Sequence, residues 1–430
     1  ELLSISRITA TDAVWLASDD DGSDATDLFV QLGAADPDAR RVKMAPELFG
    51  KALAADVARH AGACLGLAVN YAGSYCVPVD SLRSPSFTQR YGISASIMDE
   101  LPYNLVAQPG DKERGVALMQ QGPGVYDEYV VDWLYRPVPG AVTPEDEVAE
   151  LDRRIAARRS DPMCLYTPPP VAVALDPRSM PYNLGDDPVR AAAYEFANYA
   201  YVMKHADEWI GAEDADYTFR SLVQASVMNQ LYYAFVSVSA NLGGVYLNEK
   251  HEGDALPTYL SVPRGLQRRA LQFMLEQLED MSWLDNERLN KDVVEVVSLG
   301  EYCRDMLSDV IFKSLSTLDL SASKSDDPYT QDDAMDDLYR YILRDVAAGR
   351  ESTEANIAMQ RLLLINVIRN AGVVTQTRRS AASASAFAGE ALPDAAALSR
   401  RAKMARVFPE MTSDPVSGVL PMRSVAFMVR

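Results

Sequence analysis

Long helical patterns dominate the second half of the chain. Apolar residues recur there at spacings of three and four, which is typical of helices with one buried face. The predicted helices cover residues 189–211, 216–240, 264–280, 296–317, 331–348, 352–371 and 390–406. Between the second and third of these, residues 243–263 carry the alternation and turn residues of a β-hairpin. We therefore expect a helical C-terminal region over residues 189–430.

The patterns before residue 160 are shorter and more varied. Residues 1–10 alternate apolar and polar positions and predict a strand, and residues 19–26 predict an acidic loop. A lone strand needs sheet partners, and little of the chain before residue 45 can supply them. We therefore expect upstream chain to build most of that sheet.

A helix is predicted over residues 46–66. Pro46 suits a first helical turn, and Gly66 can end the helix in the left-handed conformation. One face of this helix carries apolar residues at helical spacing: Leu48, Leu53, Val57, Ala61 and Cys64. Three further segments are predicted after it: ordered irregular structure over 70–115, a charged helix over 145–159 and a connector with seven prolines over 161–188.

Composition narrows the range of functions. Hydrophobic residues make up 48% and charged residues 24% of the 430 residues, which is ordinary for a folded protein. The formal net charge of −20 disfavours nucleic acids and anionic membrane surfaces as partners, because both attract a basic face. No apolar run reaches the length of a membrane span. The chain begins at Glu1 rather than Met, and we expect that an upstream segment has been removed.

Cysteine and histidine are scarce. The four cysteines form no CxxC pair, and we interpret them as buried or free thiols rather than as a disulfide framework. They are Cys64, Cys76, Cys164 and Cys303. The three histidines are scattered, whereas a His-rich zinc site needs two or three imidazoles at one point.

Residues 59–71, RHAGACLGLAVNY, have the spacing of the zinc motif HExxHxxGxxH but lack its ligands. In that motif two histidines project from one helix face, a glutamate activates the zinc-bound water, and a glycine turns the chain toward a third histidine. The corresponding positions, with the residue that follows the motif, are Arg59, His60, Ala63, Gly66, Val69 and Asn70. Arg59, Ala63 and Val69 replace the three histidines. His60 replaces the glutamate, and Gly66 is retained.

Downstream segments carry a stronger resemblance. The chain has PVDSLRS at residues 78–84, SIMD at 96–99 and VAQPGD at 106–111, in that order. The segments GVYD, WLYRPVPGA, LGDD, NLGGVY and SVPRGLQRRALQFML follow. In these segments the chain resembles a family of large bacterial exported zinc-dependent metallopeptidases of the metzincin class. The resemblance runs from Glu1 and weakens after about residue 300.

The resemblance implies an α+β fold that is predominantly α. A truncated metzincin-like catalytic-domain remnant would occupy residues 1–160, with the active-site helix at 46–66 and the Met-turn at 96–99. A Pro-rich connector over 161–188 and the helical region over 189–430 would follow. The resemblance also implies zinc as the cofactor of the family, and the bacterial periplasm or outer-membrane surface as the location.

Met98 and Asp99 fall in the implied Met-turn. In metzincins that methionine lies beneath the metal, and here we interpret Met98 as a core methionine.

The departures from the zinc motif predict that no catalytic residue and no metal site is intact. Ala63 and Val69 have no donor atom, and the fixed positive charge of Arg59 would repel zinc. His60 could act as a base, but it would lack a Lewis acid to activate water. Arg59 either binds an anionic group, such as a peptide carboxylate, or pairs with an acidic neighbour.

A shifted metal site is the remaining alternative on this helix. Asp56, His60 and Cys64 lie in one row along it. Such a row spans about 12 Å, so its three side chains cannot all reach one ion. We therefore interpret them as polar positions on a partly buried face.

Three hypotheses about function follow. In the first, the chain is a catalytically inactive, exported metzincin homologue that binds a peptide or protein in the former cleft or scaffolds a cell-envelope complex. In the second, it is an active zinc endopeptidase whose metal site is rebuilt or is completed by upstream chain. In the third, it is one half of a split protein, and a separate N-terminal chain completes its sheet.

Overall fold

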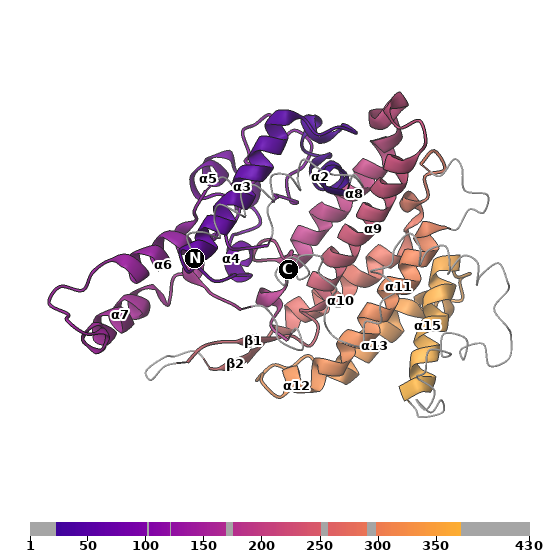
Figure 1. Cartoon of the computed structure of the whole chain (residues 1–430). Helices are drawn as coiled ribbons and strands as arrows, with labels where there is room; N and C mark the ends of the chain where they lie inside the picture. The colour runs from indigo at the N-terminus through magenta and orange to yellow at the C-terminus, as the bar shows by residue number, and fades with distance from the viewer. Residues whose placement is uncertain are drawn as a thin grey trace, which may run out of the picture.

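The computed structural model describes residues 23–100, 103–120, 122–168, 175–250, 257–289 and 298–370. Within these residues the chain is predominantly helical, as predicted, with one two-stranded sheet (Figure 1). The predicted strand over residues 1–10 and the predicted helix over 390–406 lie outside the described residues. No helix in the described part is long and apolar enough to span a membrane.

Long helices of the second half pack side by side and confirm the predicted pattern (Figure 1). They are α8 (Pro188–Ile210), α9 (Thr218–Ser239), α10 (Arg264–Glu279), α11 (Leu299–Ser314), α13 (Gln331–Ile342) and α15 (Glu354–Asn370). Two shorter helices belong to the same region: α12 (Leu318–Ala322) and α14 (Arg344–Ala347). Single 3-10 turns at Gly211–Glu213, Ser282–Leu284 and Leu315–Thr317 link some of them.

Helix α9 lies at the centre of this bundle and contacts α8, α10 and α11. Fourteen of its 22 residues are buried, among them Val223, Val227, Leu231 and Phe235. A helix with so little exposed surface is expected in the interior of a large domain. The main hydrophobic core of the protein therefore forms around α9.

The predicted hairpin is confirmed. Strand β1 (Val245–Leu247) pairs antiparallel with β2 (Tyr259–Ser261), and Tyr246 lies opposite Leu260. Val245 faces the core, because its side chain is buried. The hairpin leads from α9 into α10 at one end of the bundle (Figure 1).

The predicted acidic loop over residues 19–26 is wrong in its second part. Helix α2 (Ser23–Leu32) begins inside it and packs against α9 and α8. Phe29 is fully buried in the main core, with its ring centroid 5.4 Å from that of Phe219. Contacts with a helix far along the chain thus override a local composition typical of a turn.

Helix α3 (Pro46–Cys64) confirms the helix predicted over residues 46–66. Gly66 has a φ of 87°, and the next amide, of Leu67, donates to the carbonyl oxygen of Gly62. This is the left-handed helix ending that the glycine predicted. The apolar face is a different matter: Leu48 is buried, but Val57 is 45% exposed and Cys64 is exposed. The structure does not bury that face.

Irregular chain with short helices follows α3, as predicted for residues 70–115. The short helices are α4 (Ala72–Tyr75) and α5 (Pro85–Tyr91), with 3-10 turns at Pro37–Ala39 before α3 and Ser81–Arg83 after it. Helices α6 (Val125–Tyr135) and α7 (Pro144–Arg158) then project from the body as a pair (Figure 1). The second of these confirms the charged helix predicted over residues 145–159.

The proline-rich segment 161–188 contains 3-10 turns at Pro162–Cys164 and Pro177–Ser179. Its described residues pack against the chain around α4. The amide of Tyr71 donates to the carbonyl oxygen of Thr167, and the amide of Gly185 donates to that of Ser74. These bonds attach the segment to the region that follows α3.

Candidate binding cleft beside helix α3

Helix α3 lies directly against the SIMD segment. A Cβ atom added at Gly62 would lie 2.7 Å from the Sδ atom of Met98 and 3.2 Å from the Cδ1 atom of Ile97. Glycine thus permits a close approach that any side chain would obstruct. Met98 is 3% exposed, which confirms its interpretation as a core methionine. The structure therefore brings residues 59–71 of α3 and the following turn into contact with the SIMD segment.

The carboxylate of Asp127, on α6, holds the SIMD segment from one side. It accepts hydrogen bonds from the Ser96 hydroxyl at 2.6 Å and from the amides of Ile97 and Gly124 at 2.8 Å each. Burial raises the pKa of Asp127, and these hydrogen bonds oppose that rise. The bonds fix the start of the segment in place.

Asp99 and Asn70 hold the same segment from the other side. Asp99 Oδ2 accepts from the amide of Ser74 at 2.5 Å and from the hydroxyl of Ser94 at 3.2 Å. The amide of Asn70 donates to the carbonyl oxygen of Met98 at 3.2 Å, and its side chain donates to that of Leu165 at 2.9 Å. Asn70 and Asp99 are buried, and their contacts give them structural roles.

The positions that align with the zinc motif offer little metal chemistry. The guanidinium of Arg59 pairs with Asp56 at 3.2 Å, as one of its two interpretations predicted. His60 Nδ1 lies 2.9 Å from the carbonyl oxygen of Asp56. Ala63 is exposed and Val69 is partly exposed, and neither side chain has a donor atom for a metal.

Zinc does not fit these side chains. A protein zinc site needs three or four nitrogen, sulfur or oxygen donors at about 2.0–2.3 Å. Across the described residues, no group of three His, Cys, Asp or Glu side chains is placed to hold a metal ion. The four cysteines are free, and Cys64 is exposed on α3.

A cavity of about 260 Å³ lies between α3 and the SIMD segment. The helix contributes Asp56 and Arg59 to its lining, and the SIMD segment with the next residue contributes Asp99 and Glu100. Tyr103 and Tyr182 add aromatic rings from more distant parts of the chain. The volume is just below the range of about 300–1,000 Å³ typical of small-molecule sites.

Glu100 is an acidic cavity residue whose pKa is shifted. Burial raises the pKa of its carboxyl group, and the hydroxyl of Tyr71 and the charge of Arg59 oppose the rise only in part. Its Oε2 atom is buried and has no hydrogen-bond partner among the described residues. Raised pKa values of this kind are common at functional sites.

Comparison with known protein families decides the ancestry. A family model described as Met-zincin matches residues 41–349, a range that contains α3, the SIMD segment and the cavity lining. The chain belongs to the Met-zincin family. Comparisons with curated proteins and with solved structures give no match.

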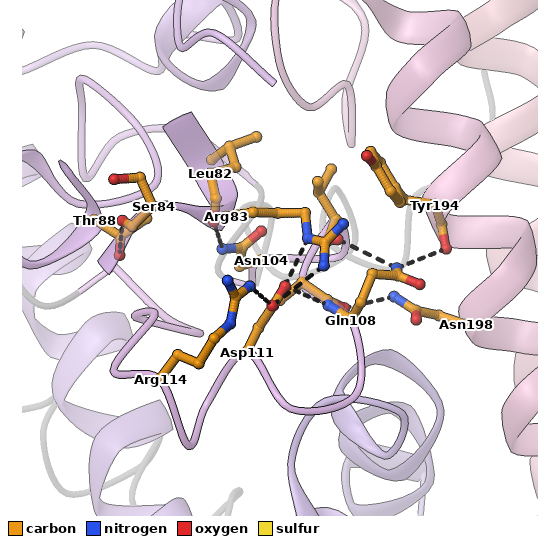
Figure 2. Close-up of polar contacts among 12 residues, drawn as sticks. Leu82, Arg83, Ser84, Thr88, Asn104, Gln108, Asp111, Arg114, Tyr194 and Asn198 are labelled. Carbon is orange, nitrogen blue, oxygen red and sulfur yellow. Dashed lines mark hydrogen bonds and ion pairs between the residues drawn. The ribbon is translucent and has the colours of Figure 1, made fainter. Parts of the chain in front are cut away.

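The other segments that suggested a Met-zincin serve the scaffold (Figure 2). Arg83 of PVDSLRS pairs with Asp111 of VAQPGD, with 2.7 Å between Nε and Oδ2. The amide of Gln108 donates to the same oxygen at 2.8 Å. Burial alone would raise the pKa of Asp111, but these partners and Arg114 outweigh burial, and the pKa is lowered. The pair therefore holds two loops of the family together.

The same loops are attached to helix α8 (Figure 2). The Asn198 side chain donates to the carbonyl oxygens of Leu105 and Ala107, at 2.8 Å each. The Gln108 side chain donates to the carbonyl oxygen of Tyr194 at 3.2 Å. These bonds connect the cleft side of this Met-zincin with the helical bundle.

Sequence reasoning did not assign several cavity residues to a site, among them Glu100, Tyr103 and Tyr182. A signal for Glu100 was available, because it directly follows the SIMD segment. Tyr182 carried no such signal, since it reaches the cavity from the proline-rich segment.

Proposed function

We propose that this Met-zincin is a non-catalytic homologue of exported bacterial metallopeptidases, and that it binds a peptide segment in the cleft beside α3. The cell envelope of a bacterium is its proposed location, on the resemblance to that exported family. The observation that carries the proposal is the contrast at α3. The scaffold around the motif is kept, whereas the side chains at the ligand positions carry no metal donors.

Retention of the scaffold supports a binding role. Gly62 still receives Met98, Gly66 still ends the helix, and Asp127 still holds the SIMD segment. A cavity remains next to these residues. Such geometry is useful to a protein that still places a ligand there.

Loss of the donors supports the absence of catalysis. Activation of water at neutral pH by a zinc peptidase depends on the metal, which lowers the pKa of the bound water to about 7. Arg59 is a permanent cation, and it already pairs with Asp56. No side chain at the three ligand positions can take over that task.

Metal analysis and a peptidase assay test the proposal. Purified full-length chain is dialysed against zinc, and its metal content is measured by mass spectrometry. Casein cleavage is measured with and without a chelator. We expect zinc well below one equivalent and no chelator-sensitive cleavage.

A restored motif supplies the matched positive control. The variant carries Arg59→His, His60→Glu, Ala63→His and Val69→His, which rebuild HExxHxxGxxH around the retained Gly66. We expect this variant to bind about one zinc per chain, because two of the new histidines lie one turn apart on α3. Stoichiometric, chelator-sensitive zinc in the unaltered chain would overturn the proposal and favour the active-enzyme alternative.

A further inference from the structure

The charges that line the cavity do not cancel. Three carboxyl groups, of Asp56, Asp99 and Glu100, face one guanidinium, that of Arg59. Arg59 and Asp56 form a pair at 3.2 Å and largely neutralise each other. The carboxylate of Asp99 is already held by the amide of Ser74 and the hydroxyl of Ser94. Glu100 is left as the acid whose charge is not balanced within the lining.

Within the described part of the chain Glu100 forms no salt bridge, although the charge of Arg59 acts on it, and its carboxyl group is largely buried. The hydroxyl of Tyr71 donates to its carboxyl group, while Oε2 is buried without a partner among the described residues. A buried carboxylate is costly unless a charged or hydrogen-bonding partner compensates for lost water. Glu100 is among the residues that line the cavity, and the terminal torsion of a glutamate is broad. The chemical complement is a positively charged donor.

The other residues that line the cavity suit a ligand with an aliphatic chain that ends in such a charge. Ala52, Ala55 and Ala58 line the cavity along α3 and offer methyl groups without bulk. Two tyrosines, Tyr103 and Tyr182, also line the cavity. Aromatic faces attract ammonium groups by cation–π interaction, worth about 0.5–2 kcal/mol.

Tyr182 is held in an unusual backbone conformation. Its φ is 59°, one of two positive values outside glycine in the described part of the chain. Its ring packs on that of Tyr233, with centroids 4.7 Å apart. Residues held in sparsely populated conformations cluster at binding sites, where the surroundings fix them in place. Here the conformation keeps a tyrosine on the cavity wall.

We propose that this cavity binds an alkylammonium group, with the carboxylate of Glu100 as its counter-ion and the α3 alanines along its stem. The lysine side chain of a peptide and a free aliphatic diamine share this chemistry. The inference rests on the proposed function of the cleft as a ligand site. It adds the class of side chain that the cleft selects.

Ligand-observed NMR and calorimetry on the full-length chain test the inference. Three probes are compared: Nα-acetyl-lysine methylamide, 1,5-diaminopentane, and Nα-acetyl-norleucine methylamide, which matches the lysine stem without its charge. We expect both amines to bind at least about tenfold more tightly than the norleucine probe, the effect of one charge-assisted hydrogen bond. The amine that binds more tightly shows whether the ligand is a lysine side chain or a free diamine.

Two variants locate the binding. Glu100→Gln keeps the shape of the side chain and removes its charge, so amine affinity should fall about tenfold. Asp336→Asn, at an exposed position on α13, is the matched control and should change nothing. Ala55→Leu fills the cavity from α3 and should abolish binding, while Ala54→Leu, at an exposed position of the same helix, should not.

The outcomes separate this inference from the proposed function. Equal affinity for the amine and norleucine probes, or an unaltered affinity in folded Glu100→Gln, overturns the inference. If a random peptide library still binds and Ala55→Leu still blocks that binding, the proposed function stands without it. If no library member binds to protein with an unchanged melting temperature, the proposed function itself fails.

Discussion

Helices α3 and α9 have similar lengths, 19 and 22 residues, but very different surroundings. Helix α9 is buried on most of its surface by α2, α8, α10 and α11. Helix α3 buries only Leu48 and Gly62. The burial of α9 explains why its sequence is rich in apolar residues. For α3, the two features that need explanation are its contact with Met98 and its share of the cavity wall. The bundle thus supplies the main hydrophobic core, whereas α3 supplies part of a cavity wall.

The largest expected effect on stability comes from a substitution in the core of the helical bundle. Phe235 of α9 is fully buried in the main core, and Phe235→Ala should lower the free energy of unfolding by about 3–5 kcal/mol. Val57 of α3 is 45% exposed, so Val57→Ala should cost less than about 0.5 kcal/mol. Urea denaturation followed by circular dichroism measures both. Similar losses in the two variants would mean that α3 carries as much of the stability as α9.

A second prediction concerns a buried acid in the bundle. Glu195 of α8 is buried, and burial raises its pKa to about 8, although the Tyr199 hydroxyl donates to it at 3.4 Å. The folded state therefore keeps a proton that the unfolded chain, with a glutamate pKa near about 4.3, has lost. The folded protein binds more protons over this interval, so its stability should fall by several kcal/mol as pH rises from about 4.5 to 8.

Glu195→Gln provides the control for that prediction. The amide is close in shape to the protonated acid and does not titrate in this range. Unfolding free energies measured at several pH values should show a shallower decline for the variant than for the unaltered chain. Parallel curves would show that other groups control the pH dependence.

The two regions also differ in what the sequence could predict. The bundle helices and the hairpin follow from short-range periodicity, which is a strong signal for long amphipathic segments. Helix α2 was missed, because its contacts with α9 outweigh a local composition of Ser and Asp. The ends of α3 were predicted from Pro46 and Gly66, but periodicity cannot tell which neighbours a helix will have, so its apolar face was assigned wrongly.

The cleft could be predicted from the sequence even less than the bundle could. Its Met-zincin ancestry could be predicted from ordered segments such as PVDSLRS and VAQPGD, and the structure shows why these segments go together: Arg83 pairs with Asp111. The cavity needs residues from α3, the SIMD segment and the proline-rich segment at once. No local sequence pattern predicts that these three segments come together. The separate N-terminal chain expected to complete a sheet stays a prediction, since residues 1–10 lie outside the described part.

The smallest expected effect sharpens the role of α3. Two of its glycines differ in one respect: a Cβ at Gly50 would meet open space, whereas one at Gly62 would meet Met98 at 2.7 Å. Gly50→Ala should stabilise the protein by about 0.5–1 kcal/mol, because alanine restricts the unfolded chain and favours the helix. Gly62→Ala gains the same term but must displace a buried methionine, which costs about 1–3 kcal/mol.

We therefore expect Gly62→Ala to be about 1–3 kcal/mol less stable than Gly50→Ala. Chemical denaturation of both variants measures the difference. Combining Gly62→Ala with Met98→Ala removes the clash, so the two changes should interact favourably instead of adding. Strict additivity would show that α3 and the SIMD segment do not constrain each other. The segments around α3 would then lack the rigidity that the proposed binding cleft requires.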